Sequence, residues 1–134
     1  MDAKQFNKVV EDFAVVDVPA IVLSVQKQVA LRGLASLVKR TPVDTGRARN
    51  NWQVGIDQEP PDVLYPAAQA FLGDKSGSPA VNKGTSKIRS LRPFCVCYLT
   101  NNVEYILDLE NGSSAQAPHG MLSVTLHDLA SMFR

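Results

Sequence analysis

Two histidines are the first residues to test for chemistry, because histidine is the commonest general acid or base near neutral pH. His127 stands beside Asp128 in a segment with helical spacing, and His119 follows Pro118 in an expected loop. Adjacent residues of a helix point about 100° apart, so Asp128 does not orient His127 as the partner of a catalytic base would. The serines around Gly112 lie in no nucleophile elbow. We therefore expect a polar helix face at His127 and no enzymatic activity.

The only cysteines, Cys95 and Cys97, alternate with apolar residues in an expected strand. Residues two apart on a strand point the same way, but a disulfide between them would strain the backbone. Two cysteines do not complete a closed four-ligand zinc site, and the two histidines lack the matching spacing. Gly73, Gly77 and Gly84 match neither glycine spacing of phosphate-binding loops. We expect two small apolar residues in a strand of a cytoplasmic protein, and no metal or cofactor.

A basic stretch is the remaining candidate for chemistry. Residues 73–92 carry five basic side chains against Asp74 alone: Lys75, Lys83, Lys87, Arg89 and Arg92. They belong to an irregular, proline-rich region, residues 58–93, and a structureless loop of this length is usually functional or disordered. We expect a mobile basic loop at residues 73–92. Its side chains are candidates for assembly contacts or for phosphate contacts with DNA in a channel, because no aromatic residues are interleaved for base stacking. The alternative is a solvated loop.

The composition indicates one globular domain over residues 1–134. Of the 134 residues, 45% are apolar and 20% are charged, and the net charge is +1. A net charge this small gives no overall attraction to nucleic acid or to an anionic membrane. We see no secretory signal and no apolar run long enough to span a bilayer, and we expect no membrane contact.

The N-terminal part predicts two helices. Asp2 and Gln5 form a capping-box pair, and an apolar face follows for two turns. The β-branched residues at 15–18 break the pattern, and Asp17 can cap a longer helix that ends near residue 39. This second helix is either a central helix wrapped by its own domain or one that touches both its own core and a neighbouring subunit, because it carries two apolar stripes on opposite sides. The stripes are Ile21, Val22, Val25 and Val29 on one side and Leu23, Ala30, Leu31, Leu34, Leu37 and Val38 on the other.

Two strands are expected, one on each side of the irregular region. Residues 42–46 have turn chemistry and form a corner that leads into a strand, where apolar and polar residues alternate from Trp52. Residues 94–99 are apolar on both faces, which predicts a second strand covered on both sides. The expected strand core is Trp52 and Tyr98, with Val54, Ile56, Phe94 and Val96 beside them.

The C-terminal third predicts two further helices. Residues 103–110 indicate a short helix closed by Asn111 and Gly112. Apolar residues at i, i+4, i+7 and i+11 from Leu122 predict a terminal helix, with Pro118 near its start. The expected class is α+β: a small antiparallel sheet packed against a long N-terminal helix and a C-terminal helix, with a long irregular loop between the strands.

Three segments, in the same order along the chain, resemble one protein family. The run TPVDTGRARNNW at residues 41–52 follows a long helix, YILDLENGSS follows at 105–114, and APHGM follows at 117–121. They resemble motifs of the minor tail components that act at the head–tail junction of long-tailed bacteriophages, known as neck or tail-completion proteins. The motif residues are expected to determine the fold, because they lie at a helix-to-strand corner and at a helix end: Pro42, Asp44, Thr45, Gly46, Trp52, Tyr105, Glu110 and Gly112.

The resemblance implies a structural virion protein and not an enzyme. It implies a homo-oligomeric ring, sixfold by the resemblance, that completes the tail or neck beside head-closure, tail-terminator or tail-tube proteins. The expected location is the virion, and the host cytoplasm during assembly. One alternative is a tail terminator that caps the tail tube. Another is a small cytoplasmic nucleic-acid-binding module that uses the basic stretch, with a salt-dependent affinity for DNA.

Overall fold

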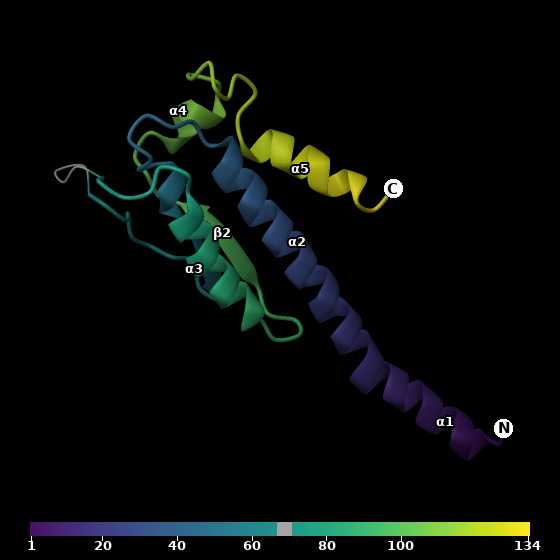
Figure 1. The fold of residues 1–134 in the computed structure, drawn as a ribbon. Helices are drawn as coiled ribbons and strands as arrows, with labels where there is room; N and C mark the ends of the chain where they lie inside the picture. Colours follow the sequence, from purple (N-terminus) through teal and green to yellow (C-terminus); the bar gives the residue numbers. More distant parts are fainter. Residues whose placement is uncertain (67–70) are drawn as a thin grey trace.

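The computed structural model describes residues 1–66 and 71–134 and has the predicted α+β class (Figure 1). A long helical segment comprises α1 (Ala3–Asp12), a π-helical turn (Phe13–Asp17) and α2 (Val18–Arg40). A 3₁₀ turn (Arg49–Asn51), strand β1 (Trp52–Ile56) and helix α3 (Ser78–Arg89) follow. The chain continues through β2 (Cys97–Asn101), α4 (Ile106–Glu110) and α5 (Leu122–Ser131).

The N-terminal helix is continuous, so the break predicted at residues 15–18 is wrong. Asp2 and Gln5 form the predicted capping box, in which the backbone N–H of Gln5 donates to Asp2 Oδ1 over 2.8 Å. At the expected break the helix forms a π turn, in which the N–H of Val18 donates to the carbonyl of Phe13. β-branched residues lower helix propensity only slightly, so the backbone bonds continue through them. Asp17 makes no side-chain capping bond within the described chain.

The core lies where the C-terminal half of α2 meets β1 and α3. Four residues of one predicted α2 stripe are buried there: Ala30, Leu34, Leu37 and Val38. In the other stripe Ile21 and Val25 stay 56% and 42% exposed, so α2 is not a central helix wrapped by its own domain. Figure 1 shows the N-terminal part of the long helix projecting away from the rest of the chain.

The two strands pair antiparallel and place the centre of β1 in the core. Val54 lies opposite Leu99, and Trp52 lies opposite Asn101. Trp52 is 8% exposed and Val54 is 3% exposed, which confirms the predicted burial of both. Ile56 packs against the edge of this core and is only half-buried.

The second strand begins at Cys97 and not at Phe94. Phe94 has a φ of 66° and is 67% exposed, and Val96 is 52% exposed, so their predicted burial is wrong. Before the strand, the N–H of Val96 donates to the carboxylate of Asp57 over 2.9 Å, and the Val96 carbonyl accepts the N–H of Asp57 over 2.8 Å. Tyr98 is half-buried instead of largely buried. Alternating apolar residues locate a strand without revealing what covers its faces.

Helix α3 lies where the sequence predicts a mobile loop at residues 73–92, so that prediction is wrong. Pro79 occupies the first turn of α3, where a proline is favourable. A Cβ on Gly84 would collide with the side chains of Leu34 and Val54, so α3 approaches the core closely at this glycine. The buried stripe was overlooked because two of its three members are too small to stand out as apolar: Ala80, Gly84 and Ile88.

Helices α4 and α5 confirm the two predicted C-terminal helices, with α4 shorter than expected. Gly112 follows α4 with a φ of 87°, in the left-handed region that a helix-closing glycine adopts. Helix α5 lies beside the C-terminal half of α2 (Figure 1) and contacts it through Thr125, which is buried. Only part of its predicted apolar face is used, because three of its members remain exposed: Leu122, Leu126 and Phe133.

Candidate functional site

The first motif of the resemblance forms the corner between α2 and β1. Thr41 is fully buried, donates its hydroxyl to the Leu37 carbonyl over 2.6 Å and accepts the indole N–H of Trp52 over 2.7 Å. Gly46 has a φ of 93°, and a Cβ there would lie 2.9 Å from the Cα of Lys75. The corner therefore needs glycine at this position. One threonine hydroxyl ties the end of the helix to the start of the strand.

A cavity of about 510 Å³ brings residues of two motifs together. Gln116 lies in the loop between α4 and α5 and fixes that loop to the corner. Its Nε2 donates to the Val43 carbonyl over 3.0 Å, and its Oε1 accepts the Val43 N–H over 2.9 Å. Five of the motif residues line this cavity: Pro42, Asp44, Thr45, Gly46 and Tyr105. Trp52, Glu110 and Gly112 do not line it, so the eight motif residues do not form one site.

Arg47 is the buried cation of this cavity, and sequence reasoning missed it. Its guanidinium donates to both carboxylate oxygens of Glu104, at 2.7 and 3.0 Å, and to the carbonyl of Tyr65. It also lies 5.9 Å from the ring centroid of Tyr105, within cation–π range. The hydrogen bonds to Glu104 raise the pKa of Arg47, and the same bonds lower the pKa of Glu104. Arg47 belongs to the first motif, but its partner is 57 residues away.

Two buried asparagines hold the loops beside the corner, and the sequence analysis did not single them out. Asn51 accepts the N–H of Leu64 over 2.7 Å and donates to the Leu64 carbonyl over 2.9 Å. Asn50 donates to the carbonyls of Gly46 and Asp74, at 2.9 and 2.8 Å. Such side chains satisfy backbone groups that have no strand or helix partner. The only sequence feature that could have indicated this role is the position of the two asparagines directly before a strand.

Glu110, the last residue of α4, caps α5 across the loop that joins these two helices. Its Oε2 accepts the N–H groups of Met121 and Leu122, both at 2.8 Å, and its Oε1 accepts the N–H and the hydroxyl of Ser123, both at 3.0 Å. Burial opposes ionisation of Glu110, but these donors outweigh it and hold its pKa below the ordinary value. A Cβ on Gly120, which has a φ of 80°, would collide with Glu110. The second and third motifs therefore form one joint.

The five basic residues proposed for assembly or DNA contacts are exposed, but they occupy different surroundings. Lys83 and Lys87 lie one turn apart on α3 and line the same small cavity of about 150 Å³. Arg92 has its Nη2 atom 3.6 Å from a carboxylate oxygen of Asp57, so its charge is partly balanced. The remaining two lie near the ends of α3: Lys75 before it and Arg89 as its last residue.

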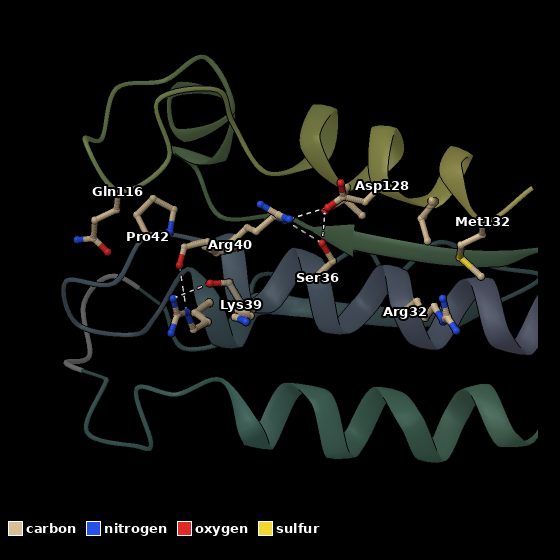
Figure 2. Close-up of a pocket in the computed structure, with 12 residues that line it drawn as sticks. Arg32, Ser36, Lys39, Arg40, Pro42, Gln116, Asp128 and Met132 are labelled. Atoms are coloured by element: carbon tan, nitrogen blue, oxygen red, sulfur yellow. Dashed lines mark hydrogen bonds and ion pairs between the residues drawn. The ribbon is translucent and has the colours of Figure 1, made fainter. Parts of the chain in front are cut away.

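A basic groove of about 580 Å³ between α2 and α5 was not predicted from the sequence (Figure 2). Arg40 forms an ion pair with Asp128 at 2.6 Å and donates to Ser36 Oγ over 3.1 Å. Arg49 donates to the carbonyls of Thr41 and Lys39, at 3.0 and 2.9 Å, at the C-terminal end of α2. These two arginines hold α5 and the end of α2 in place, so the groove is a joint of the fold.

The candidates for metal or catalytic chemistry are the two histidines and the two cysteines. Asp128 bonds Arg40 and does not orient His127, in agreement with the interpretation of a polar helix face. Cys95 and Cys97 are half-buried free thiols, and burial raises the pKa of Cys97. Within residues 1–66 and 71–134, no three His, Cys, Asp or Glu side chains are grouped so that they could hold a metal ion. Among the described helices, none has the length and apolar character needed to cross a membrane.

The projecting helix carries an apolar face that no described segment covers. Six of its large apolar side chains are 42% to 58% exposed, and we call them the N-terminal stripe: Phe6, Val9, Val10, Phe13, Ile21 and Val25. The π turn absorbs about one residue, so Phe13 and Ile21 are separated by the equivalent of about two α-helical turns. The π turn thereby brings the exposed residues of α1 and α2 onto one face. None of the residues of α1, all of which are described, is buried.

Comparison of the chain with protein-family models, curated proteins and solved structures found no match. The three motifs, the joints that they form and the N-terminal stripe are therefore the observations from which a function can be proposed.

Proposed function

We propose that this chain is a structural virion protein of the bacteriophage head–tail connection, which forms a homo-oligomeric ring and completes the tail or neck. The observation that carries this proposal is the N-terminal stripe, a row of large apolar side chains on a projecting helix. Contiguous exposed apolar patches on soluble proteins mark interaction sites. The stripe accounts for the two apolar sides of the long helix. One side packs on the chain's own core, and the other side contacts a partner.

The three motifs support the proposal because each lies at a joint that fixes a helix. The bond between Thr41 and Trp52 fixes the direction of the long helix relative to the sheet, and Glu110 fixes α5. Subunits of a ring meet at a constant angle only when their contact surfaces are held rigidly. Resemblance to tail-completion proteins at these particular residues therefore fits a subunit that presents helices to its neighbours.

The proposed partners are further copies of the chain, in a ring that is sixfold by the resemblance. The ring would lie in the virion at the head–tail junction, next to head-closure, tail-terminator or tail-tube proteins, after assembly in the host cytoplasm. Exposed lysines such as Lys83 and Lys87 would contact phosphates of DNA in the channel without sequence preference.

The test is a nonsense codon in the gene for this chain, in the phage that encodes it. We expect electron microscopy of the lysate to show filled heads and tails of normal length that are not joined, and the chain supplied from a plasmid should restore joined particles. Infectious particles at normal yield without the chain would contradict the proposal. Tails of uncontrolled length would instead identify the chain as the tail terminator.

The nucleic-acid-binding alternative has one observation in its favour, the exposed Lys83 and Lys87 on one side of α3. Binding to double-stranded DNA would be measured between about 50 and 200 mM salt, where affinity from phosphate contacts falls steeply. A strong, salt-dependent affinity that Lys83→Ala with Lys87→Ala abolishes would favour this alternative over a purely structural role.

A further inference from the structure

Helix α5 and the turn after it carry a second apolar stripe that the described chain leaves uncovered. Leu122 and Leu126 lie one turn apart on α5, and Phe133 lies two residues after the last residue of the helix; the three side chains are 45%, 55% and 64% exposed. We call them the C-terminal stripe. Another side of α5 contacts α2 through Thr125, whose hydroxyl lies 2.8 Å from Ser36 Oγ.

The chain cannot bring the α1 part of its N-terminal stripe onto its own C-terminal stripe. Helix α5 meets the long helix near Ser36, and Phe13 lies about 35 Å from there at roughly 1.5 Å per residue. The helix is continuous between these points, so α1 cannot fold back onto α5 without breaking it. In Figure 1, α5 lies beside the C-terminal half of α2 and α1 lies at the far end. No described segment of the chain therefore covers α1.

We propose that the N-terminal stripe of one copy docks on the C-terminal stripe of the next copy. The inference rests on the proposed function, because it takes the partner to be a second copy, and it names the surfaces through which copies meet. Two different surfaces on one chain make a head-to-tail contact, which closes into a ring when the rotation permits. Pairing of α1 with α1 would instead give a closed dimer and leave the C-terminal stripe uncovered.

Helices α1 and α5 match in length, and the two stripes supply enough area for a specific contact. Helices α1 and α5 have 10 residues each, about 15 Å of helix. Full burial removes roughly 60–120 Å² of an aliphatic side chain and about 150–250 Å² of an aromatic one. The half-exposed side chains of both stripes therefore offer on the order of 500–600 Å² of apolar area. Because little more than half of an interface is apolar, the whole contact would bury about 1,000 Å², the lower end for a biological interface.

Docking along the stripe leaves the charged side of α1 in water. The charged residues Lys4, Lys8, Glu11 and Asp12 lie together around a hollow on the surface, away from the stripe. On α5, Asp128 is engaged with Arg40 and does not belong to the C-terminal stripe. The contact therefore leaves the charges of α1 and the ion pair of Arg40 and Asp128 in water.

The test uses two variants that each damage one stripe, Val9→Glu and Leu126→Glu. Their controls, Asn7→Glu and His127→Glu, add a carboxylate to other sides of the same helices. Sedimentation velocity would follow all five proteins up to about 1 mM, where a contact with a Kd of about 100 μM is largely formed. We expect the wild type and both controls to gain mass with concentration, and each stripe variant to associate at least about 10-fold more weakly.

Mixing the two stripe variants is the decisive step. The intact N-terminal stripe of one variant can dock on the intact C-terminal stripe of the other, so the mixture should form one-to-one pairs and nothing larger. Thermal melts should stay within a few degrees of the wild type, because Val9 and Leu126 are exposed in the free chain.

Several outcomes would overturn the inference: a wild type that stays monomeric at the highest concentration, a stripe variant that assembles like the wild type, or a mixture that forms no pairs. A phage that carries Val9→Glu separates this inference from the proposed function. Joined particles in that phage would overturn the docking inference, whereas joined particles in the nonsense mutant would overturn the proposed function.

Discussion

Glu110 provides a direct test of how the last helix is attached to the rest of the chain. Glu110→Ala removes four hydrogen bonds at the start of α5, two on each carboxylate oxygen. Loss of an N-terminal cap costs about 0.5–2 kcal/mol, and loss of a negative charge at a helix N-terminus costs a further ~0.3–1 kcal/mol. Because one side chain provides both effects, we predict that Glu110→Ala lowers the free energy of unfolding by about 2 kcal/mol.

Glu110→Gln removes the charge of this side chain and keeps its shape, so it measures the contribution of the charge. The amide keeps one acceptor oxygen and loses the other, so we predict a loss of about 1 kcal/mol near neutral pH. The pKa of Glu110 is below its ordinary value of 4.5 in the folded chain, so its ionised form stabilises the fold. That stabilisation is complete above the unfolded pKa and disappears as the pH falls through the folded pKa. The difference between the wild type and Glu110→Gln should therefore shrink in acid.

Urea melts followed by the fluorescence of Trp52, at neutral pH and in acid, measure both effects. Hydrogen exchange at the amides of Leu122 and Ser123 should accelerate in Glu110→Ala, because these are two of the capped groups. Asp108→Asn is the matched control, since it neutralises an exposed carboxylate of the same helix α4. A Glu110→Ala protein within about 0.5 kcal/mol of the wild type would refute the capping argument.

Substitutions at three further positions test the corner. Trp52→Phe leaves the Thr41 hydroxyl without its indole donor and should lower the free energy of unfolding by about 1–2 kcal/mol in denaturant melts. Trp52→Ala should lower it by about 3–5 kcal/mol. A loss below about 1 kcal/mol for the alanine variant would show that Trp52 is not a core residue. Gly46→Ala forces a side chain into a φ of 93° and should lower the Tm measured by calorimetry; an unchanged Tm would show that the turn relaxes freely. Arg47→Met should lower the Tm more than Arg47→Lys, because lysine keeps the charge but cannot hold both oxygens of Glu104; equal losses would mean that the bidentate geometry is unimportant.

The sequence by itself determined the elements whose chemistry closes within a few residues. The capping box of Asp2 and Gln5 needs only its own first turn, and the left-handed conformation of Gly112 closes the helix directly before it. The alternation from Trp52 through Val54 identified β1 and its buried side. In each case the residues that decide the conformation are neighbours in the chain, so their spacing is sufficient information.

Tertiary structure decided what depends on distant partners. Gly84 makes α3 a packed helix because its missing side chain admits Leu34, and small residues leave no periodic apolar signal in the sequence. Arg47 finds Glu104 57 residues away, and no local spacing reveals that pair. The two stripes of the long helix were visible in the sequence, but which of them is covered was not. Periodicity shows that a face is apolar, whereas the surface that packs against that face is assembled from segments elsewhere in the chain, or from another molecule.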